Sequence, residues 1–512
     1  MSESRTKKVA RNAKYSLLVQ ALIYLVTFIG RSIFIHCLDQ EYLGVGGLFS
    51  NILSVLALAE LGVSVAMTYF LYKPLSERDE KQIAAYMNFY ALAYRVIGCF
   101  VLIAGAAVTP FLPYIIRDPG GIENIPLIYL LYVTSSGVSY FFAYKRTIII
   151  ADQNGYIDSV NHMLSVLVQN VLQCVVLLLW KNFILYLAVQ IATVILFNII
   201  ISIQADKRYP FLRKLKKERL SKTQMKEMFR YIGAMMSHKV GSVVVNGTDN
   251  ILITTFDGLV KTGLYSNYSL IITSLNKLIS QLFSALAASV GNLNAVSEVE
   301  HKRIVFRRCT FLNGWMTCFC SVCLWCLFQP FVTLWAGSDY LLDWSVVFVV
   351  VLNFFVRTMN HPVQTFKVAG GYFWNDRFRP IAEAVINLVA SVVLGRIMGL
   401  PGILWGTAIS ALATNFWVEP YVVFKHNLKE SPLSYFTEYG MFTALTVVLS
   451  YFTNRIVMLI PYGTVFGFLA QCAICLIVPN VLLAVLFWKK AEFVYVKQLL
   501  LGKLKKGVPH ER

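Results

Sequence analysis

Charge is scarce in this chain of 512 residues: Asp, Glu, Lys and Arg make up only 14%, whereas soluble domains carry about 25%. Hydrophobic residues make up 57%, and the mean hydropathy is +0.62. Too little polar surface remains to cover a soluble body of this size, and the same hydrophobicity excludes a disordered chain. The composition therefore predicts a multi-pass membrane protein. A soluble enzyme or a nucleic-acid binder is a poor explanation of the net charge of +19 in a chain this hydrophobic.

Motifs for cofactor or nucleotide chemistry are also lacking. No G-x-S-x-G, P-loop or G-x-G-x-x-G stands in a suitable strand–helix setting. Cys318, Cys320, Cys323 and Cys326 contain a C-x2-C-x2-C pattern, but the pattern lies inside a predicted span and lacks a fourth ligand. We therefore expect no metal and no cofactor. Any driving force would be an ion gradient, the membrane potential or the gradient of the substrate itself.

Apolar runs between polar residues predict an all-α integral membrane fold with about 14 transmembrane helices. The first run follows a basic start, is longer than a signal-peptide core and has no cleavage pattern after it, so we expect it to be retained. The predicted spans are 15–38, 44–72, 84–112, 126–147, 158–180, 183–205, 231–256, 263–291, 309–336, 344–366, 381–399, 401–424, 437–459 and 465–488.

The distribution of basic residues predicts the orientation of these spans. With the N-terminus in the cytoplasm, 36 of the 46 Lys and Arg residues fall in cytoplasmic segments or at the cytoplasmic ends of spans, and 5 fall in outer connections or at the outer ends of spans. This asymmetry would collapse if one span were added or lost midway. We therefore predict a multi-pass membrane protein with both termini in the cytoplasm.

The chain divides near its middle. We predict a six-helix bundle over 1–205, a basic cytoplasmic linker over 206–230, a second six-helix bundle over 231–424, and two extra helices with a basic tail over 425–512. The linker suits either an anionic membrane surface or a solvated connection. Gly47-Leu48-Phe49-Ser50-Asn51 and Gly263-Leu264-Tyr265-Ser266-Asn267 open the second helix of each half, which supports an internal repeat.

The remaining five cations lie in the interior of predicted spans, away from their ends, where each would cost about 2.5–3.5 kcal/mol if it faced lipid. Several lie on polar helix faces, which predicts an internal wet surface that is mainly positive. The candidate substrate-binding residues are Arg31, Lys239, Lys277, Arg357, Gln20, Asn267, Gln281 and Asn353. Glu60 and Asp249 are the mid-span acids; each either couples transport or forms structural ion pairs with Arg31, Arg95 or Lys239.

The chain resembles the Wzx-type polysaccharide flippases of the multidrug/oligosaccharidyl-lipid/polysaccharide exporter (MOP) superfamily over essentially its whole length. The motifs that carry the resemblance are Phe28-Ile29-Gly30-Arg31, Glu41-Tyr42-Leu43-Gly44, Leu48-Phe49-Ser50-Asn51-Ile52-Leu53, Ala59-Glu60-Leu61-Gly62, Leu71-Tyr72-Lys73-Pro74-Leu75, Ala143-Tyr144-Lys145-Arg146, Ala151-Asp152-Gln153, His238-Lys239-Val240-Gly241, Asn387-Leu388-Val389-Ala390-Ser391 and Gly399-Leu400-Pro401-Gly402-Ile403.

The resemblance implies a V-shaped pair of bundles, alternating access and a cationic central cavity. It implies a location in the bacterial cytoplasmic membrane and, as the substrate, an oligosaccharide linked through pyrophosphate to undecaprenol, for surface polysaccharide biosynthesis. Arg31 and Lys239 match basic cavity positions of the family, whereas Lys277 and Arg357 rest on their polar helix faces alone. The implied partners are membrane lipids, a polysaccharide polymerase and glycosyltransferases, and no nucleic acid.

Three alternatives remain open from the sequence. A lipid II flippase would carry a related polyprenyl pyrophosphate. A multidrug antiporter fits less well, because a cationic drug would favour a net acidic cavity. A membrane polysaccharide polymerase would need catalytic carboxylates, for which Asp39 and Glu41 are available, but the predicted outer loops are too short to hold an acceptor. We therefore expect a transporter and not an enzyme.

Overall fold

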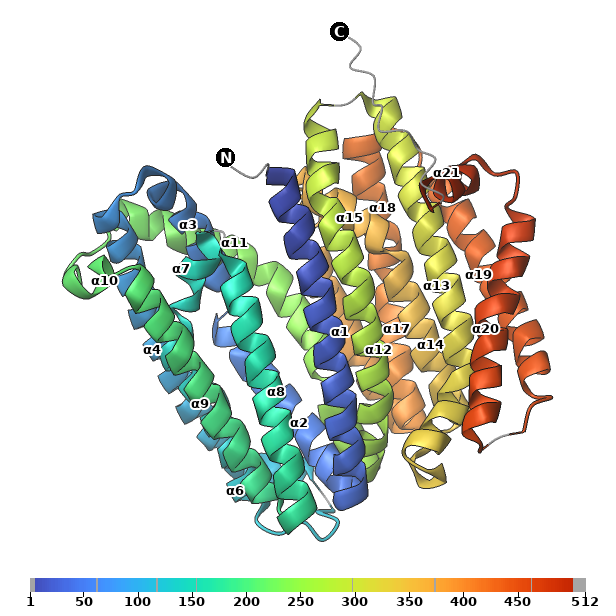
Figure 1. Cartoon of the computed structure of the whole chain (residues 1–512), viewed down its shortest axis with the longest axis horizontal. Helices are drawn as coiled ribbons and strands as arrows, with labels where there is room; N and C mark the ends of the chain where they lie inside the picture. The colour runs from blue at the N-terminus through green and yellow to red at the C-terminus, as the bar shows by residue number, and fades with distance from the viewer. Residues whose placement is uncertain are drawn as a thin grey trace. The chain divides into compact units, whose positions relative to one another are not determined.

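The computed structural model describes residues 5–60, 63–116, 118–152, 154–296, 298–372, 374–461 and 463–500, and it leaves some side chains inside these ranges undescribed. Over these ranges the chain is helical and contains no strand (Figure 1). Eight helical segments of this part are long and apolar enough to cross a membrane. The all-α, multi-pass architecture is confirmed, while the count of 14 spans stays a prediction.

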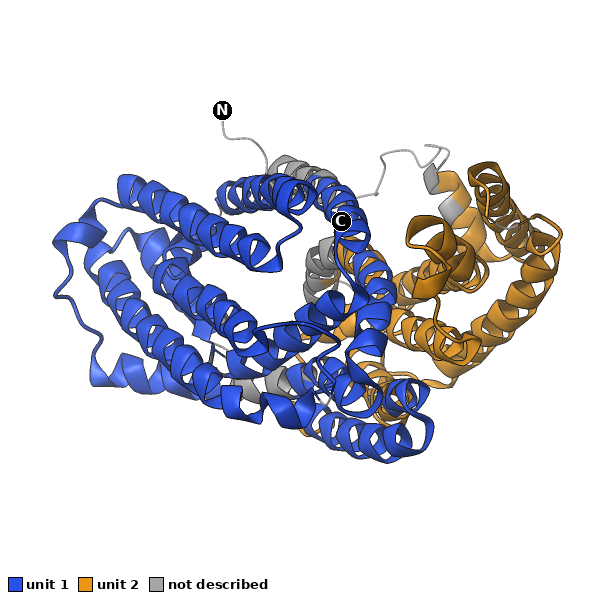
Figure 2. Ribbon diagram, turned by 90° about the horizontal axis from the view of Figure 1, so that it is seen from below, with its two compact units in different colours: residues 1–274, 380–406 blue, residues 275–379, 407–512 orange. Residues whose placement is uncertain are grey.

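The chain forms two compact units, coloured separately in Figure 2. Unit 1 comprises residues 1–274 and 380–406, and unit 2 comprises residues 275–379 and 407–512. The boundaries fall inside three helices, α12, α16 and α17, whose bounds follow. The division at the predicted linker 206–230 stays a prediction.

Unit 1 contains most of the N-terminal helices. Helix α8 packs on both α1 and α9, and α6 packs on both α4 and α9 (Figure 1). Its elements are α1 (Arg5–Cys37), α2 (Gln40–Leu56), η1 (Ala57–Glu60), α3 (Val63–Glu77), α4 (Glu80–Val108), η2 (Thr109–Phe111), α5 (Leu112–Ile115), α6 (Ile125–Ala143), α7 (Arg146–Ala151), α8 (Gly155–Trp180), α9 (Phe183–Arg208), α10 (Phe211–Lys214), α11 (Lys222–Gly247), the first part of α12 (Asp249–Val296), α16 (Arg379–Met398) except its first residue, and the first half of α17 (Leu400–Ala413).

Unit 2 is built around the 37-residue helix α13, which packs against α14, α19 and α20. Its buried core joins phenylalanines of α13, α15 and α19 to Cys318 and Cys475. Besides the parts of α12, α16 and α17 that lie outside unit 1, its elements are α13 (Val299–Trp335), η3 (Ser338–Tyr340), α14 (Trp344–Met359), α15 (His361–Gly370), α18 (Asn415–Val423), the π-helical turn η4 (Phe424–Leu428), α19 (Leu433–Val457), α20 (Val465–Leu486) and α21 (Ala491–Leu500).

Capping residues set several helix ends. The predicted break at Asn182 is confirmed: Lys181 ends α8 with φ 48°, and the Asn182 side chain accepts a hydrogen bond from the backbone N–H of Leu185 to open α9. Ser221 and Gln224 form a reciprocal capping box at the start of α11. These polar side chains satisfy backbone groups that the first turn leaves without intrahelical partners.

The structure interrupts several predicted spans. The span 44–72 becomes α2, η1 and α3, and the span 401–424 becomes α17 and α18. The span 344–366 breaks at Asn360, where Pro362 in the next turn lacks a backbone N–H to continue the α14 ladder. Between predicted spans seven and eight, the helix instead changes direction at Gly258, whose φ of 85° favours glycine.

Candidate functional site

A cavity of about 260 Å³ in unit 1 contains Arg31, the first of the predicted binding residues. Six helices line it, namely α1, α2, α6, α8, α9 and α12. The lining residues are Thr27, Gly30, Arg31, Phe34, Tyr42, Leu43, Gly46, Gly47, Ser50, Tyr132, Asn170, Phe183, Tyr186, Gln190 and Ser266. We call this cavity the Arg31 pocket.

Arg31 has no acidic partner among the described residues. Its side chain is half-buried, and no described carboxylate lies within 4.0 Å of its guanidinium. The Arg31 pocket instead places tyrosines Tyr132 and Tyr186 and the amide of Asn170 around it. An arginine has five N–H donors and carries its charge at any physiological pH, so this guanidinium is available to an anion in the cavity.

An aromatic cluster forms one wall of the Arg31 pocket. The ring of Phe34 meets Phe183 and Tyr186 edge-on, with centroids 5.9 and 5.4 Å apart. Phe183 stacks on Tyr186 at 5.7 Å and lies 4.9 Å from Tyr42. Such interlocked rings hold one another in place. The pocket therefore combines one cation, a fixed aromatic wall and several hydroxyl and amide groups.

The two predicted repeats meet at the Arg31 pocket. Ser50 of the first pentapeptide and Ser266 of the second both line it. Helices α2 and α12 cross so closely nearby that a side chain at Gly263 would collide with the backbone carbonyl of Gln40. The glycines permit this crossing because they have no Cβ. The repeat therefore gives unit 1 one serine from each copy at the same cavity.

The other predicted binding residues lie elsewhere. Gln20 is half-buried on α1 and does not line the Arg31 pocket, and Asn267 is fully buried. Lys277, Gln281, Asn353 and Arg357 belong to unit 2; Lys277 is exposed and the other three are half-buried. The side chains of Lys239 and of its neighbours His238, Ser242 and Asn246 lie outside the described residues.

The predicted mid-span acids also have defined positions. Glu60 lies in η1 and accepts a hydrogen bond from the Tyr94 hydroxyl, and it lies within 4.0 Å of neither Arg31 nor Arg95. Arg95 is exposed on α4, and Asp249 is half-buried at the first residue of α12. Of the partners proposed for Glu60, only the undescribed Lys239 side chain remains to be placed.

A buried charge cluster in unit 2 was missed by the sequence analysis. Lys367 donates to Asp376 at 2.7 Å and to Glu419 at 2.5 Å. Arg379 contacts the same two acids at 3.0 and 3.2 Å, and Asn360 donates to Glu419. The sequence places Lys367 and Arg379 in the predicted cytoplasmic segment between spans 344–366 and 381–399, but their side chains are only 5% and 10% exposed. Glu419, an acid inside an apolar run, was the available signal.

The charge cluster is balanced, since two cations face two anions. Burial alone raises the pKa of Asp376, but the ion pairs with Lys367 and Arg379 outweigh it and lower that pKa below its ordinary value. Asp376 is therefore ionised near neutral pH, and the two cations and two acids of the cluster satisfy one another through ion pairs. We regard the cluster as a structural element of unit 2.

Comparisons with known proteins bear on the fold. No family model and no curated protein matches the chain. Among solved structures, it is similar to the lipid II flippase MurJ in an inward closed conformation, with a TM-score of 0.63 and 14% identity, over 91% of this chain and 99% of that one. It is similar to an inward-facing MATE multidrug transporter, with a TM-score of 0.61 and 14% identity, over 80% and 98%.

The chain has the fold of MOP-superfamily transporters.

A third structure with this fold, a MOP-superfamily transporter from Pyrococcus furiosus, has a TM-score of 0.50 and 13% identity, over 83% of this chain and 97% of that one. It is described as having a binding pocket of reverse polarity that suggests a different function. At these identities the similarity shows the MOP fold alone. The binding chemistry of this chain therefore follows from its own side chains.

Proposed function

We propose that the chain is a flippase that carries an oligosaccharide, linked through pyrophosphate to a polyprenol, across the bacterial cytoplasmic membrane by alternating access. Its biological role would be surface polysaccharide biosynthesis. The observation that supports this proposal is the Arg31 pocket, a polar cavity within the membrane fold whose cation faces no described carboxylate.

The chemistry of the Arg31 pocket suits such a head group. A pyrophosphate diester carries about two negative charges, and a guanidinium binds phosphate oxygens through charge-assisted, bidentate hydrogen bonds. Sugar hydroxyls need partners, because an unpaired hydroxyl in an apolar medium costs several kcal/mol. Ser50, Asn170 and Gln190 supply such partners, while the aromatic wall offers flat apolar faces to sugar rings. Lys239 on α11 remains the proposed second cation.

A lipid II flippase is the second candidate, because MurJ shares the fold and lipid II is also a polyprenyl pyrophosphate. The Arg31 pocket does not discriminate between the two substrates. A cationic drug is a poorer candidate, since an uncompensated guanidinium repels it. Deletion of the gene separates the first two functions: loss of a lipid II flippase halts growth, whereas loss of a surface-glycan flippase leaves growth and removes the glycan.

Arg31→Gln tests the proposal. Purified protein would be reconstituted into vesicles with a fluorescent undecaprenyl-pyrophosphate oligosaccharide, and its translocation measured by the accessibility of the glycan to a glycosidase. We expect a loss of roughly 10- to 100-fold, the equivalent of one charged hydrogen bond. Lys73→Gln is the control, because the Lys73 side chain is 81% exposed. Equal rates for wild type, Arg31→Gln and Lys73→Gln would overturn the assignment.

A second pair of vesicles separates the two lipid-linked substrates. One contains the labelled oligosaccharide lipid and the other contains labelled lipid II. Translocation of the first at a clearly higher rate supports the surface-glycan function. Translocation of lipid II alone would replace it with the cell-wall function, and translocation of neither would reject both.

A further inference from the structure

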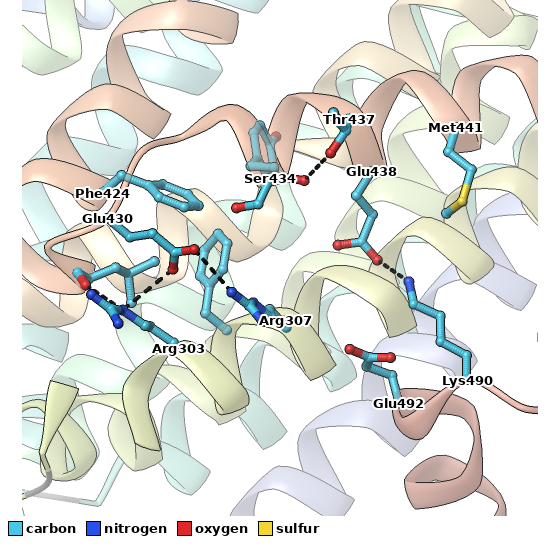
Figure 3. A pocket seen from close by; sticks show the side chains of 13 residues that line it. Arg303, Arg307, Phe424, Glu430, Ser434, Thr437, Glu438, Met441, Lys490 and Glu492 are labelled. Atoms are coloured by element: carbon cyan, nitrogen blue, oxygen red, sulfur yellow. Dashed lines mark hydrogen bonds and ion pairs between the residues drawn. The ribbon is translucent and has the colours of Figure 1, made fainter. Parts of the chain in front are cut away.

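A second cavity, of about 400 Å³, lies in unit 2 at the ends of helices (Figure 3). It is lined by Arg303, Phe306, Arg307, Phe424, Leu428, Glu430, Ser434, Tyr435, Thr437, Glu438, Met441, Lys490 and Glu492. These residues lie at, just inside or just outside the ends of predicted spans, on the side predicted to be cytoplasmic. The cavity therefore lies at the level of lipid head groups, and we call it the end pocket.

Two arginines form one side of the end pocket. Arg303 is held in place by the carbonyl oxygens of Leu428 and Lys429, at 2.9 and 2.8 Å, and by Glu300 and Glu430. Arg307 makes a single ion pair, to Glu430 at 3.0 Å, and its side chain is 50% exposed. Since a guanidinium has five N–H donors, most of the hydrogen-bonding capacity of Arg307 remains for a ligand.

Two carboxylates line the other side of the end pocket. Lys490 pairs with Glu438 at 3.0 Å, and its ammonium also lies 4.9 Å from the centre of the Phe311 ring. Glu492 lines the same end, is half-buried, and forms no hydrogen bond or ion pair with the described residues. Figure 3 shows Glu438 and Glu492 near Lys490, away from the pair of arginines. Lys490 therefore pairs with Glu438, whereas Glu492 has no ion-pair partner among the described residues.

The surroundings of the end pocket suit the membrane surface. Its wall includes Phe306, Phe424 and Tyr435, which are all buried. The short helix α21 follows Lys490 and packs on α13 through Phe493, which stacks on Trp315 at 5.5 Å. Trp488 beside it is 57% exposed and carries the Lys497 ammonium 3.9 Å from its ring. Exposed tryptophan next to lysine is typical of the bilayer interface.

We propose that the end pocket binds the head group of a phosphatidylethanolamine-type phospholipid from the adjoining leaflet. The phosphate would accept hydrogen bonds from Arg307, and the primary ammonium would donate to Glu492. A zwitterion matches this pocket because one guanidinium with spare donors lies at one end, and at the other lies a carboxylate that pairs with none of the described residues. A quaternary ammonium has no N–H to donate, so choline lipids fit less well.

The test uses the purified full chain in detergent. Its thermal midpoint is measured with added short-chain phosphatidylethanolamine, phosphatidylcholine and phosphatidylglycerol, and bound lipid is counted by native mass spectrometry. We expect the ethanolamine lipid to raise the midpoint most and to bind at least tenfold more tightly than the other two. Equal effects of the choline lipid would overturn the ammonium contact. Equal effects of the glycerol lipid would overturn the zwitterion assignment.

Variants locate the bound head group. Arg307→Gln and Glu492→Gln should each reduce the affinity for phosphatidylethanolamine about tenfold, whereas the exposed pair Lys73→Gln and Glu77→Gln should not change it. If Arg307→Gln is poorly folded, Arg307→Lys serves instead. Unchanged affinity in Glu492→Gln and in a well-folded Arg307 variant would refute the site. Free phosphoethanolamine that binds as tightly as the lipid would show a soluble ligand and refute the lipid source.

Discussion

The Lys367 ammonium lies 2.7 Å from the Asp376 carboxylate, and both side chains are almost completely buried. The lysine is on α15 and the aspartate lies in the segment that joins α15 to α16. Glu419 of α18 approaches the same ammonium from the other side. The pair therefore ties a connecting segment to two helices of unit 2. Because it lies in a region with little water, losing one partner should cost much more than at a surface ion pair.

Lys367→Met should strongly destabilise the protein. It leaves two buried carboxylates with one arginine, and breaking such a pair costs about 3–5 kcal/mol. Lys367→Met combined with Glu419→Gln restores the charge balance, so the double variant should be more stable than the sum of the single effects predicts. The measurement is unfolding of the detergent-solubilised protein. Strict additivity would contradict a coupled cluster.

Asp376 should make the stability of the folded protein depend on pH only at acidic pH. Its pKa in the folded protein is lowered, so its contribution is complete above the unfolded value of about 4 and disappears as the pH falls through the lower folded value. The thermal midpoints of wild type and Asp376→Asn should differ by a constant amount from pH 5 to 8 and converge below about pH 4. The exposed Asp39→Asn is the control. A difference between the two thermal midpoints that increases as the pH falls would contradict the lowered pKa of Asp376.

Arg31→Lys should retain part of the function that Arg31→Gln loses. Lysine keeps the positive charge but lacks the planar fork that contacts two phosphate oxygens at once. We expect the affinity for an undecaprenyl-pyrophosphate glycan to decrease in the order wild type, Arg31→Lys, Arg31→Gln, as measured by competition with a labelled lipid. A lysine variant as weak as the glutamine variant would indicate that Arg31 acts through geometry and not through charge.

Gly263→Ala should destabilise unit 1. The added methyl group would meet the backbone carbonyl of Gln40 where α2 and α12 cross, and forcing atoms into a packed site costs about 1–3 kcal/mol. Gly233→Ala in α11 is the matched control, because nothing lies within 4 Å of a Cβ there. That change should be neutral or stabilising, since alanine favours the helix by up to about 1 kcal/mol. Comparable loss in both variants would reject the close crossing.

The sequence predicted most helices but not their interruptions. Hydropathy runs end near polar residues, so the break at Asn182 and the bend at Gly258, which lies between predicted spans 231–256 and 263–291, were visible, while the interruption at Glu60 was not. Glycine and acidic residues occur in continuous helices as well as at breaks. Whether such a residue interrupts a helix depends on its neighbours, such as Tyr94 beside Glu60.

The candidate site was predictable only in part. Arg31 and the pentapeptide repeat pointed to the pocket, because a cation inside an apolar span needs a polar surrounding. The aromatic wall and Asn170 gave no separate signal, since phenylalanine, tyrosine and asparagine are frequent throughout the chain. Gln20 shares a helical face with Arg31, yet it does not line the cavity. Helical spacing identifies a face but not the depth of a cavity.

By itself the sequence determined that this is an all-helical membrane protein with a basic residue inside its first span, because hydropathy and helical period are local properties. Only the tertiary structure decided which charges are compensated. Lys367, which the sequence places in a connecting segment, is buried between two acids, and Arg31, which the sequence places within an apolar span, faces a polar cavity with no described acid beside it. The physical reason is that ion pairing depends on distances of a few ångströms between segments far apart in the chain.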